Sequence, residues 1–542
     1  MRTPRIGVIV DNRCVAPWQA EALRTIAGKY DLLLYNCTNT RPARRRAKHA
    51  LYYVLNLFTI RNRLTRSVTF PNDVPIVRET SFESGYEGTW QTLPKQLIER
   101  FAEDEIAALV KFGMGLLRIP NGAEFPPILS YHHGDPRHYR GRPAGFYEIA
   151  ERADRLGQVV QLLTNDLDSG SIAAFGETRV HRHSYRATLI EAYRISPLLL
   201  HRAIKNALAG QATPVAKGPV YRLPANKTVA AFCAKLLWNY VKRLHYGALV
   251  EKRWQVAHAE IATHEPTRIV SDFPRPEHWT IEPIPAGYHF IADPFFHPAG
   301  NGILVEGLSK SSGLGEILHL GSGEPRRLTP STRHWSYPAT ISLGNEHFVV
   351  PEIAESSPVR LFRLTSNALE PVPNFVVEGE PSLIDPTLFE HQGRFYLFGN
   401  RLNEAPSVLR LWTSTALRAP FVEHPASPVR ISPAGSRMAG RIAVAPDGSL
   451  WRLGQDSTRD YGDGVLLFEI EQLSAEEYEE VERGRLRFMH VRGPHTVNFD
   501  ESRALFDFYR NRTSPFAGLR RFVRLMALRR RGGTSEILGR TA

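Results

Sequence analysis

A histidine pair and an aspartate in the first 200 residues have the types and spacing of an acid–base unit. His132 and His133 lie in the segment SYHHGDPRHYRGRPAGFYE (130–148), which follows an apolar run. Asp168 lies in a second segment, LTNDLDSGSI (163–172), which follows another apolar run. A carboxylate beside an imidazole fixes the tautomer of the ring and stabilises its protonated form, which suits proton transfer. A lone histidine in a loop is more often simply solvated. The prediction of an acid–base site therefore depends on the aspartate that accompanies the histidine.

The surrounding pattern alternates short apolar runs with helical periodicity. Strand-like runs occupy residues 6–10, 31–35, 106–110 and 127–131, and residues 17–29 have apolar side chains at helical spacing. This alternation predicts a parallel α/β sheet with helices on both faces. Ligands of such sheets bind beyond the carboxyl ends of the strands. Both polar segments are therefore expected at a binding edge.

These residues resemble the formyltransferase family that uses 10-formyltetrahydrofolate, which includes methionyl-tRNA and sugar N-formyltransferases. That family has Asn-x-His, an Arg-Gly about seven residues later, and an Asp-x-Gly about 36 residues after the His. Here Asp168-Ser169-Gly170 begins 36 residues after His132, whereas Arg140-Gly141 begins eight residues after His132 and seven after His133. Either histidine is thus a match, and we favour His132. The resemblance covers about residues 1–205.

The resemblance implies acyl transfer, with 10-formyltetrahydrofolate as the formyl donor. His132 would relay the proton of an attacking amine, Asp168 would orient His132, and Ser130 would donate to the oxyanion. Ser130 stands where the family has asparagine, and loss of one oxyanion donor costs about 10²–10³ in rate. Either the site is shifted, another donor substitutes, or activity is weak. Substrate-binding roles are implied for Arg140, Gly141 and Gly113, the last in a run that matches a folate-contacting loop.

From about residue 253 the pattern becomes short β-rich runs between turns. A degenerate unit recurs, with a small or Asp-Pro opening, an apolar strand, a turn and a second apolar strand. Its anchors at residues 293, 337, 385, 441 and 497 are 44 to 56 residues apart. This spacing suits one four-stranded blade per repeat and predicts a five-bladed β-propeller. A sandwich with chance similarity is the alternative.

The Asp-Pro repeats resemble the propeller of glycoside hydrolase family 43 and, more closely, the N-terminal domain of plant glucosamine inositolphosphorylceramide transferases. Such hydrolases gather an acid and a base from the innermost strands around a central pocket. The corresponding positions here hold Asp293, Tyr337, Asp385 and Arg441, so the acid set is incomplete. We interpret the pocket as carbohydrate-binding or vestigial, with hydrolysis as a minor possibility.

The fold class is therefore multidomain α/β plus all-β. We assign residues 1–208 to the formyltransferase-like domain, 209–252 to a linker and connecting helix, 253–509 to the propeller and 510–542 to a basic helical tail. Three scattered cysteines argue against a disulfide framework, and no metal-ligand spacing occurs. No apolar run reaches the roughly 20 residues of a membrane span. We expect a cytoplasmic protein.

The net charge of +13 on 542 residues is unevenly distributed. Residues 281–509 carry 20 basic and 29 acidic side chains, whereas residues 1–280 carry 39 and 25 and residues 510–542 carry 9 and 1. In the tail, Leu519, Phe522, Val523 and Met526 share one helical face among arginines. Such a helix suits peripheral contact with an anionic membrane at its inner face, with a solvated end as the alternative. No nucleic-acid partner is expected.

The leading hypothesis is a formyltransferase-like enzyme of glycan biosynthesis. It would formylate the amine of a nucleotide- or lipid-linked amino sugar, and the propeller would bind the carbohydrate. The alternative is a glycan-binding or glycoside hydrolase-like protein whose first domain is a degenerate scaffold. A tRNA formyltransferase is less favoured, because nothing after residue 205 resembles that family's small C-terminal barrel.

Overall fold

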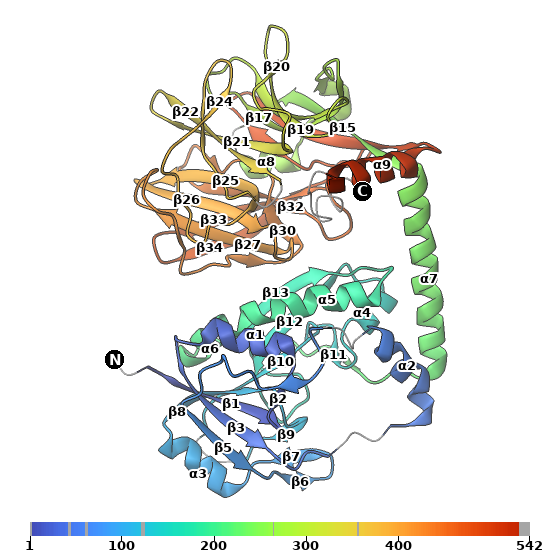
Figure 1. Cartoon of the computed structure of the whole chain (residues 1–542), viewed down its shortest axis with the longest axis vertical. Coiled ribbons are helices and arrows are strands. Elements are labelled where there is room, and N and C mark those ends of the chain that lie inside the picture. Colours follow the sequence, from blue (N-terminus) through green and yellow to red (C-terminus); the bar gives the residue numbers. More distant parts are fainter. Residues whose placement is uncertain are drawn as a thin grey trace. The chain divides into compact units, whose positions relative to one another are not determined.

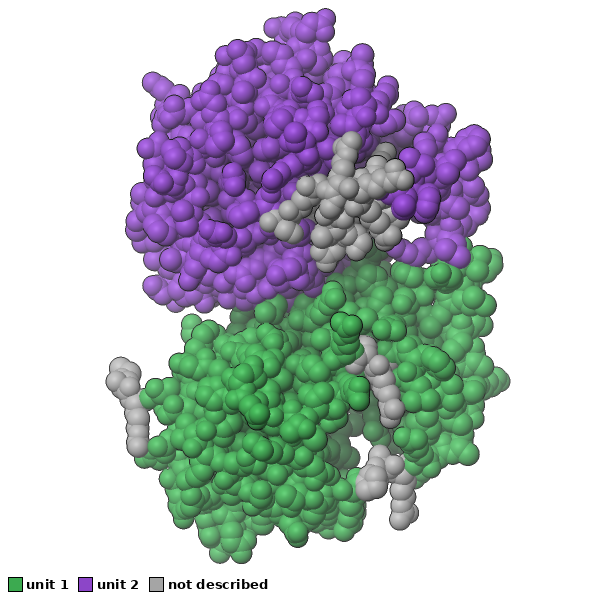
Figure 2. All heavy atoms as spheres, in the orientation of Figure 1, with its two compact units in different colours: residues 1–241 green, residues 242–542 purple. Residues whose placement is uncertain are grey.

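The computed structural model describes residues 3–41, 45–59, 63–120, 125–263, 265–354 and 357–530. The chain forms two compact units, residues 1–241 (unit 1) and residues 242–542 (unit 2), which Figure 2 shows in two colours. Helix α7, Asn226–Leu249, runs from the first unit into the second (Figure 1). Each unit is described by itself.

Unit 1 is built on a mostly parallel sheet. The parallel strands lie in the order β10 (Ile128–His132), β8 (Ile106–Lys111), β1 (Arg5–Asp11), β3 (Asp31–Cys37) and β5 (Arg78–Phe82). Two antiparallel strands, β12 (Arg155–Leu162) and β13 (Ile172–Arg179), extend the sheet beyond β10. Two short antiparallel strands, β2 (Cys14–Val15) and β4 (Val68–Thr69), branch from the end of β1. The central strands are almost entirely apolar because helices cover both of their faces.

The helices of unit 1 pack on both sides of this sheet, as the alternating pattern predicts. Figure 1 shows α3 on one face and α1, α5 and α6 on the other. The helices are α1 (Pro17–Ile26), α2 (Ala50–Thr59), α3 (Lys95–Glu103), α4 (Phe146–Ala150), α5 (Tyr185–Ile195) and α6 (Leu200–Leu208). Two small sheets complete the unit: β6 (Gly85–Glu87) with β7 (Trp90–Thr92) and β9 (Leu116–Arg118), and β11 (Arg140–Gly141) with β14 (Val220–Tyr221).

The described part of unit 2 forms five antiparallel sheets, of which the first combines strands from the beginning and the end of the unit. The first three sheets have four strands each. The first contains, in spatial order, β16 (Thr280–Ile281), β15 (Val250–Glu260), β36 (Arg503–Thr513) and β35 (Val497–Phe499). The second contains β17 (Tyr288–Phe296), β18 (Ile303–Ser309), β19 (Gly315–Leu320) and β20 (Arg326–Arg327), and the third contains β21 (Trp335–Leu343), β22 (Glu346–Ile353), β23 (Phe362–Leu364) and β24 (Leu369–Pro371).

The fourth sheet contains β25 (Leu383–His391), β26 (Arg394–Arg401), β27 (Val408–Ser414), β28 (Val422–Glu423) and β29 (Arg430–Ile431). The fifth contains β30 (Ala434–Met438), β32 (Leu450–Asp456), β33 (Val465–Leu473), β34 (Tyr478–Leu486) and β31 (Ala443–Val444). Two helices, α8 (Pro266–Ser271) and α9 (Ala517–Arg530), complete unit 2. The repeated antiparallel sheets agree with the repeat in the sequence, and their closure into a propeller stays a prediction.

The first sheet joins the two ends of unit 2. Strand β15 pairs with β36 over its whole length, from Val250 opposite Thr513 to Glu260 opposite Arg503. The remaining sheets are formed by stretches that are continuous in the chain. This pairing therefore joins the beginning of unit 2 to its end.

The opening strands of three successive sheets share one local distortion. Asp293, Tyr337 and Asp385 each lie at an interruption of the strand register, and each has a φ of 48°. This left-handed conformation is unfavourable for a residue with a side chain and costs of order 1–3 kcal/mol. A bulge bends the strand and redirects the side chain. The three anchors of the sequence repeat that are followed by proline are therefore equivalent positions in the structure.

Part of the predicted basic tail, residues 531–542, lies outside the described residues. The described part of the tail is the helix α9. Among the described residues, no helix combines the length and the apolarity needed to cross a membrane.

Candidate functional site

In unit 1, the ends of two strands bring His132 and Asp168 together. His132 is the last residue of β10, and Asp168 lies in the turn between β12 and β13. The Nδ1 atom of His132 is 3.5 Å from Oδ2 of Asp168, which also accepts the backbone N–H of Gly141 at 2.9 Å. Ser130 lies two residues earlier on β10 and so on the same face as His132. The geometry permits the predicted pair, whose catalytic role stays a prediction.

The second ring nitrogen of His132 is also engaged. Nε2 lies 2.8 Å from the backbone carbonyl of Tyr139. Because a carbonyl oxygen only accepts, Nε2 must carry the proton. The cavity beside it holds about 10 Å³, close to the volume of a single water. With residues 133–143 in this position, both ring nitrogens of His132 are engaged, and the adjoining cavity is too small to hold the folate donor.

The neighbouring His133 has a different environment. Its Nε2 is 2.9 Å from the hydroxyl of Ser196, and its ring packs against Trp18 and Tyr193, with ring centroids 5.2 and 4.4 Å away. Burial, and then the adjacent His132, lower the pKa of His133 to about 3. His133 is therefore a neutral packing residue. Of the two histidines that the motif spacing leaves open, only His132 contacts Asp168.

Arg140, Gly141 and Gly113 have structural contacts at this site. The guanidinium of Arg140 donates from Nε and Nη2 to the carbonyl of Leu167, at 3.0 and 2.5 Å, and so holds the turn that carries Asp168. A Cβ on Gly141 would lie 2.2 Å from the carbonyl oxygen of Tyr221. A Cβ on Gly113 would lie 2.6 Å from a carboxylate oxygen of Asp11. These contacts explain the residue types without a bound substrate.

Lys111 is a candidate at this edge that sequence reasoning missed. It ends the central strand β8 and is in register with Ser130 of β10. Burial lowers the pKa of Lys111 to about 8, although Asp11 and Asp168 act in the opposite direction. Its Nζ donates to the carbonyl of Gly115 at 2.9 Å. The sequence signal that could have revealed Lys111 is a lysine at the end of a buried apolar strand.

Unit 2 contains a much larger cavity, of about 670 Å³. Polar side chains from successive sheets line it, and they are Asp293 (β17), Glu306 (β18), His334, Ser336 (β21), Glu352 (β22), Asp385 (β25), Arg437 (β30) and His495. Asp293 and Asp385 thus lie where the repeat places them. The roles of these residues in binding stay predictions.

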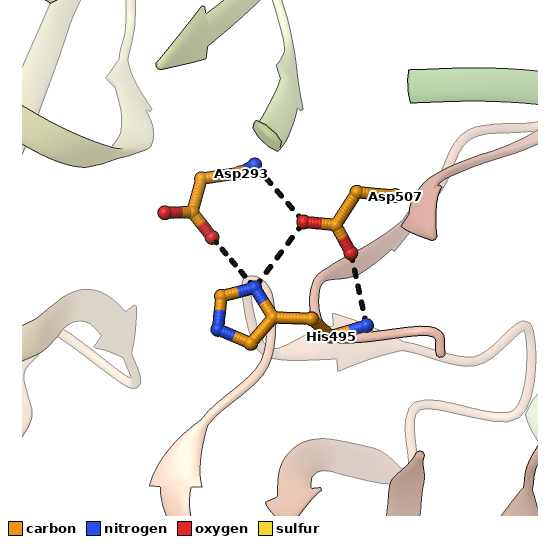
Figure 3. Close-up of side chains that lie close together, drawn as sticks. All are labelled: Asp293, His495 and Asp507. Atoms are coloured by element: carbon orange, nitrogen blue, oxygen red, sulfur yellow. Dashed lines mark hydrogen bonds and ion pairs between the residues drawn. The ribbon is translucent and has the colours of Figure 1, made fainter. Parts of the chain in front are cut away.

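A histidine between two carboxylates forms part of this cavity (Figure 3). Nδ1 of His495 is 3.2 Å from Oδ1 of Asp293 and 3.2 Å from Oδ2 of Asp507. Burial opposes the charge of His495, but Tyr461 and the two carboxylates outweigh it and hold the pKa of His495 well above its ordinary value. Its Nε2 is buried and has no hydrogen-bond partner among the described residues. The imidazolium therefore offers one unused N–H donor.

These three side chains also have the donor atoms of a metal site, since the nearest ones lie within 4.8 Å of one another. Their hydrogen bonds already account for the arrangement. Asp507 accepts the backbone N–H groups of His495 and Thr496 at 2.9 and 2.8 Å and that of Asp293 at 3.1 Å. The hydroxyl of Thr496 donates to Asp293 at 2.7 Å. Asp507 is therefore an anchor for the backbone around the cavity.

The cavity carboxyl groups are driven to different protonation states. Burial opposes ionisation of Asp293, but the charge and hydrogen bond of His495 lower the pKa of Asp293 below its ordinary value. Burial, and then the charges of Asp293 and Glu352, raise the pKa of Glu306 well above its ordinary value. These opposite pKa shifts favour the ionised form of Asp293, which accepts hydrogen bonds, and the protonated form of Glu306, which donates one. Environments that separate two carboxyl groups in this way are typical of acid–base sites.

Asp385 is bound by two side chains of the fifth sheet. Nε of Arg437 and Nε2 of Gln455 both donate to Oδ2 of Asp385, at 2.8 and 2.9 Å. Burial raises the pKa of Asp385 to about 7, although Arg437 acts in the opposite direction. Asp385 therefore titrates close to neutral pH.

The structure corrects two sequence-based assignments to this pocket. Tyr337 lies in the apolar core, where its hydroxyl accepts the backbone N–H of Gly440 at 2.8 Å. Arg441 lies beyond the end of β30, and its guanidinium donates to the carbonyl of Phe499 at 2.5 Å. Neither lines the cavity. The fifth sheet instead presents Arg437, because β30 ends at Met438, before the anchor chosen from the repeat.

Glu306 and Glu352 were not among the predicted pocket residues, although they occupy equivalent positions. Glu306 pairs with Ala292, just before Asp293, and Glu352 pairs with Ser336, just before Tyr337. Both lie in the second strands of their sheets, within largely apolar runs. A carboxylate inside an apolar strand at the same place in two repeats was the signal that could have revealed them.

Comparison with known proteins gives one family match, and it lies in unit 2. The model of the N-terminal region of glucosamine inositolphosphorylceramide transferase 1 matches residues 329–498. The relatives of that name from Oryza sativa subsp. japonica and Arabidopsis thaliana are 32% and 29% identical over 221 and 209 residues, or 37% and 36% of this chain. The chain spans less than a third of these relatives, 29% and 27% of their length.

Solved structures with detectable likeness include a probable sugar N-formyltransferase from Mycobacterium tuberculosis. It is 14% identical, with a TM-score of 0.26, and the match covers 41% of this chain and 75% of that one. Values this low carry no conclusion about activity. The architecture of unit 1 therefore rests on its own strand order.

Proposed function

We propose that unit 2 binds a sugar in its cavity and that the protein acts on a glycan or glycolipid containing an amino sugar. The carrying observation is the convergence of carboxyl, imidazole and guanidinium groups from successive sheets on one cavity of about 670 Å³. This volume lies within the range of small-molecule sites. We further propose that the five sheets are propeller blades around this cavity, which would explain why equivalent positions converge.

The protonation states of the cavity suit a sugar. Sugar hydroxyl groups both donate and accept, and ionised Asp293, protonated Glu306 and the N–H of His495 supply both kinds of partner. A free amino group on the sugar is an ammonium ion at neutral pH and would pair with Asp293. The family model that matches residues 329–498 and the curated relatives are named for glucosamine, which is an amino sugar, and this supports the substrate class.

Calorimetric titration of the full chain tests the proposal. A glucosamine-containing disaccharide should bind at least tenfold more tightly at pH 7 than its N-acetylated form, a difference of about 1.4 kcal/mol. Asp293→Asn should remove this preference. Asp447→Asn, an exposed turn residue of the same unit, is the matched control. Equal affinity for the two sugars, or identical behaviour of the two variants, would refute the proposal.

A second candidate function is formyl transfer from 10-formyltetrahydrofolate to the amine of an amino sugar by unit 1. The contact of His132 with Asp168 at the strand ends favours it. Because the Tyr139 carbonyl occupies Nε2 and the adjoining cavity is small, residues 133–143 would have to move before the donor could bind.

Release of tetrahydrofolate in the presence of amino sugars is the assay for this candidate. His132→Ala should abolish release, whereas His138→Ala, an exposed histidine in the same segment, should not change it. Release that is equal in the two variants, or absent with every acceptor, rejects formyl transfer and leaves sugar binding by unit 2 in place.

Glycoside hydrolysis by unit 2 is a third candidate, favoured by the opposite pKa shifts of Asp293 and Glu306. Sugar binding and glycoside hydrolysis predict different results for Glu306→Gln. Glutamine replaces the donor role of a protonated glutamic acid, so sugar binding is retained, but it cannot transfer a proton. Release of a reducing sugar that is lost in both Asp293→Asn and Glu306→Gln would establish hydrolysis.

A further inference from the structure

Helix α9 carries an exposed apolar stripe. Its members, spaced as neighbours on one helical face, are Phe516, which directly precedes the helix, and Leu519, Phe522, Val523 and Met526, and the first four are 57–60% exposed. Isolated exposed apolar residues are common, but a continuous stripe of five usually marks an interaction surface. We call these five residues the α9 stripe.

The other side of α9 is already docked within unit 2. Arg520 pairs with Glu251 through two contacts of 2.6 and 2.9 Å, and Arg521 donates to the carbonyls of Gly247 and Val250 at 2.5 and 2.7 Å. Ala517 is fully buried. These contacts fix the rotation of the helix about its axis, so the stripe is held outward. The described part of unit 2 therefore leaves the α9 stripe uncovered.

The charge around the stripe selects its partner. Residues 510–542 carry nine basic side chains and one acidic. Arg510 and Arg512, at the end of β36, are exposed. An apolar face with aromatic residues, bordered by arginine, suits the boundary between acyl chains and anionic head groups. A nucleic acid would not use the apolar face, and a second copy would bring like charges together.

The stripe adjoins the sugar cavity. Leu519 and Val523 line that cavity, together with the basic side chains of Lys252, Lys310 and Arg521. A surface that contacted the stripe would therefore lie at the cavity itself. We propose that α9 docks unit 2 on an anionic lipid bilayer and that the cavity takes the sugar head group of a membrane lipid. The second part rests on the sugar binding proposed above.

Vesicle sedimentation of the full chain tests the docking. Vesicles with 30% phosphatidylserine should retain the protein, neutral phosphatidylcholine vesicles should retain at least tenfold less, and salt should weaken the binding. Phe522→Glu should reduce binding to anionic vesicles at least tenfold. Met489→Glu, which alters an apolar residue of unit 2 that is 89% exposed and does not line the cavity, should leave it unchanged.

Three results would overturn the docking. They are equal binding to neutral and anionic vesicles, an equal effect of the two variants, and a change of oligomeric state on Phe522→Glu in light scattering, which would make the stripe an interface between copies. Val523→Glu provides a second exposed variant should Phe522→Glu not fold. Binding of an oligonucleotide that Phe522→Glu abolishes would likewise replace the lipid with a nucleic acid.

A glycolipid experiment separates this inference from the proposed function. Adding a lipid with a glucosamine head group should strengthen vesicle binding of the wild-type chain, and Asp293→Asn should lose only that increment. If soluble glucosamine saccharides fail to bind but anionic vesicles do, the sugar function fails and the docking stands. If soluble saccharides bind but the glycolipid gives no increment, the membrane-lipid substrate is refuted.

Discussion

Replacement of Asp293 by asparagine tests the electrostatics of the unit 2 cavity. The side chain keeps its shape but loses its charge. In the structure, Asp293 accepts the hydroxyl of Thr496 at 2.7 Å and faces Nδ1 of His495 at 3.2 Å, and all three residues are buried. Asp507 remains 3.2 Å from the same nitrogen, so His495 keeps one carboxylate.

The expected loss of stability in Asp293→Asn depends on the charge that remains beside His495. Removing one partner of a buried ion pair usually costs about 3–5 kcal/mol because it leaves an uncompensated charge. Here Asp507 still compensates His495. The loss should therefore be closer to that of one charge-assisted hydrogen bond, about 1.5–3 kcal/mol at pH 7.

The pH dependence supplies the sharper test. The pKa of His495 is raised in the folded protein, so its contribution is complete below the unfolded value of about 6.5 and is lost as the pH rises through the folded value. The pKa of Asp293 is lowered, so its contribution is present above about 3.9 and is lost as the pH falls through the folded value. The difference between wild type and Asp293→Asn should thus be largest between about pH 4 and 6.5.

Urea unfolding at pH 5, 7 and 10 would measure these differences. Trp254 is a suitable reporter, since its ring centroid is 5.1 Å from that of His495. The wild type should lose more of its advantage at pH 10 than at pH 7. A free-energy difference that is constant from pH 5 to pH 10 would refute the charged pair, and a variant more stable than wild type would refute the reasoning as a whole.

Three further outcomes follow from other residues. Glu306→Gln should change the free energy of unfolding by less than about 1 kcal/mol at pH 7 and preserve sugar affinity in calorimetry, because the raised pKa favours a protonated carboxyl, which glutamine resembles. A loss of affinity comparable to that of Asp293→Asn would contradict this. Lys111→Met should stabilise the protein by about 1–3 kcal/mol at pH 7, because burial lowers the pKa of the lysine to about 8. Denaturant titrations should show that this gain vanishes above about pH 10.5, where the lysine is neutral in both states. A gain independent of pH would point to packing instead. Tyr337→Phe should cost about 1–2 kcal/mol through the lost bond to Gly440 without changing sugar affinity, and weakened binding would return Tyr337 to the pocket.

The sheets could be predicted from the sequence because their signals are local. A buried parallel strand is a continuous apolar run, and a repeat of turns and apolar strands marks successive antiparallel sheets. The contact of His132 with Asp168 agrees with the sequence prediction, but its geometric reason differs. Strand β12 runs antiparallel to β10, so their carboxyl ends lie at opposite edges of the sheet, and it is the turn after β12 that brings Asp168 to His132. The hydrogen bond between Nε2 of His132 and the carbonyl of Tyr139 could not be predicted, because it depends on the path of a loop.

The unit 2 cavity shows where such prediction stops. Asp293 and Asp385 stand out because a proline follows each, whereas Glu306 has no such marker. Arg437 was missed in favour of Arg441, because counting along a degenerate repeat cannot locate the end of β30. His133 matched one motif spacing, but its environment is aromatic packing. These outcomes depend on contacts between residues far apart in the chain.

The pairing of β15 with β36 has a consequence for biosynthesis. During translation, residues 250–260 are made first and must wait for residues 503–513, about 250 residues later, before their sheet can form. Contacts this distant in sequence slow folding, and the waiting strand exposes an unpaired edge. We expect the nascent chain of unit 2 to need protection from aggregation until its last strand emerges. A chain stopped before residue 503 would lack the partner of its first long strand, however complete its other sheets were.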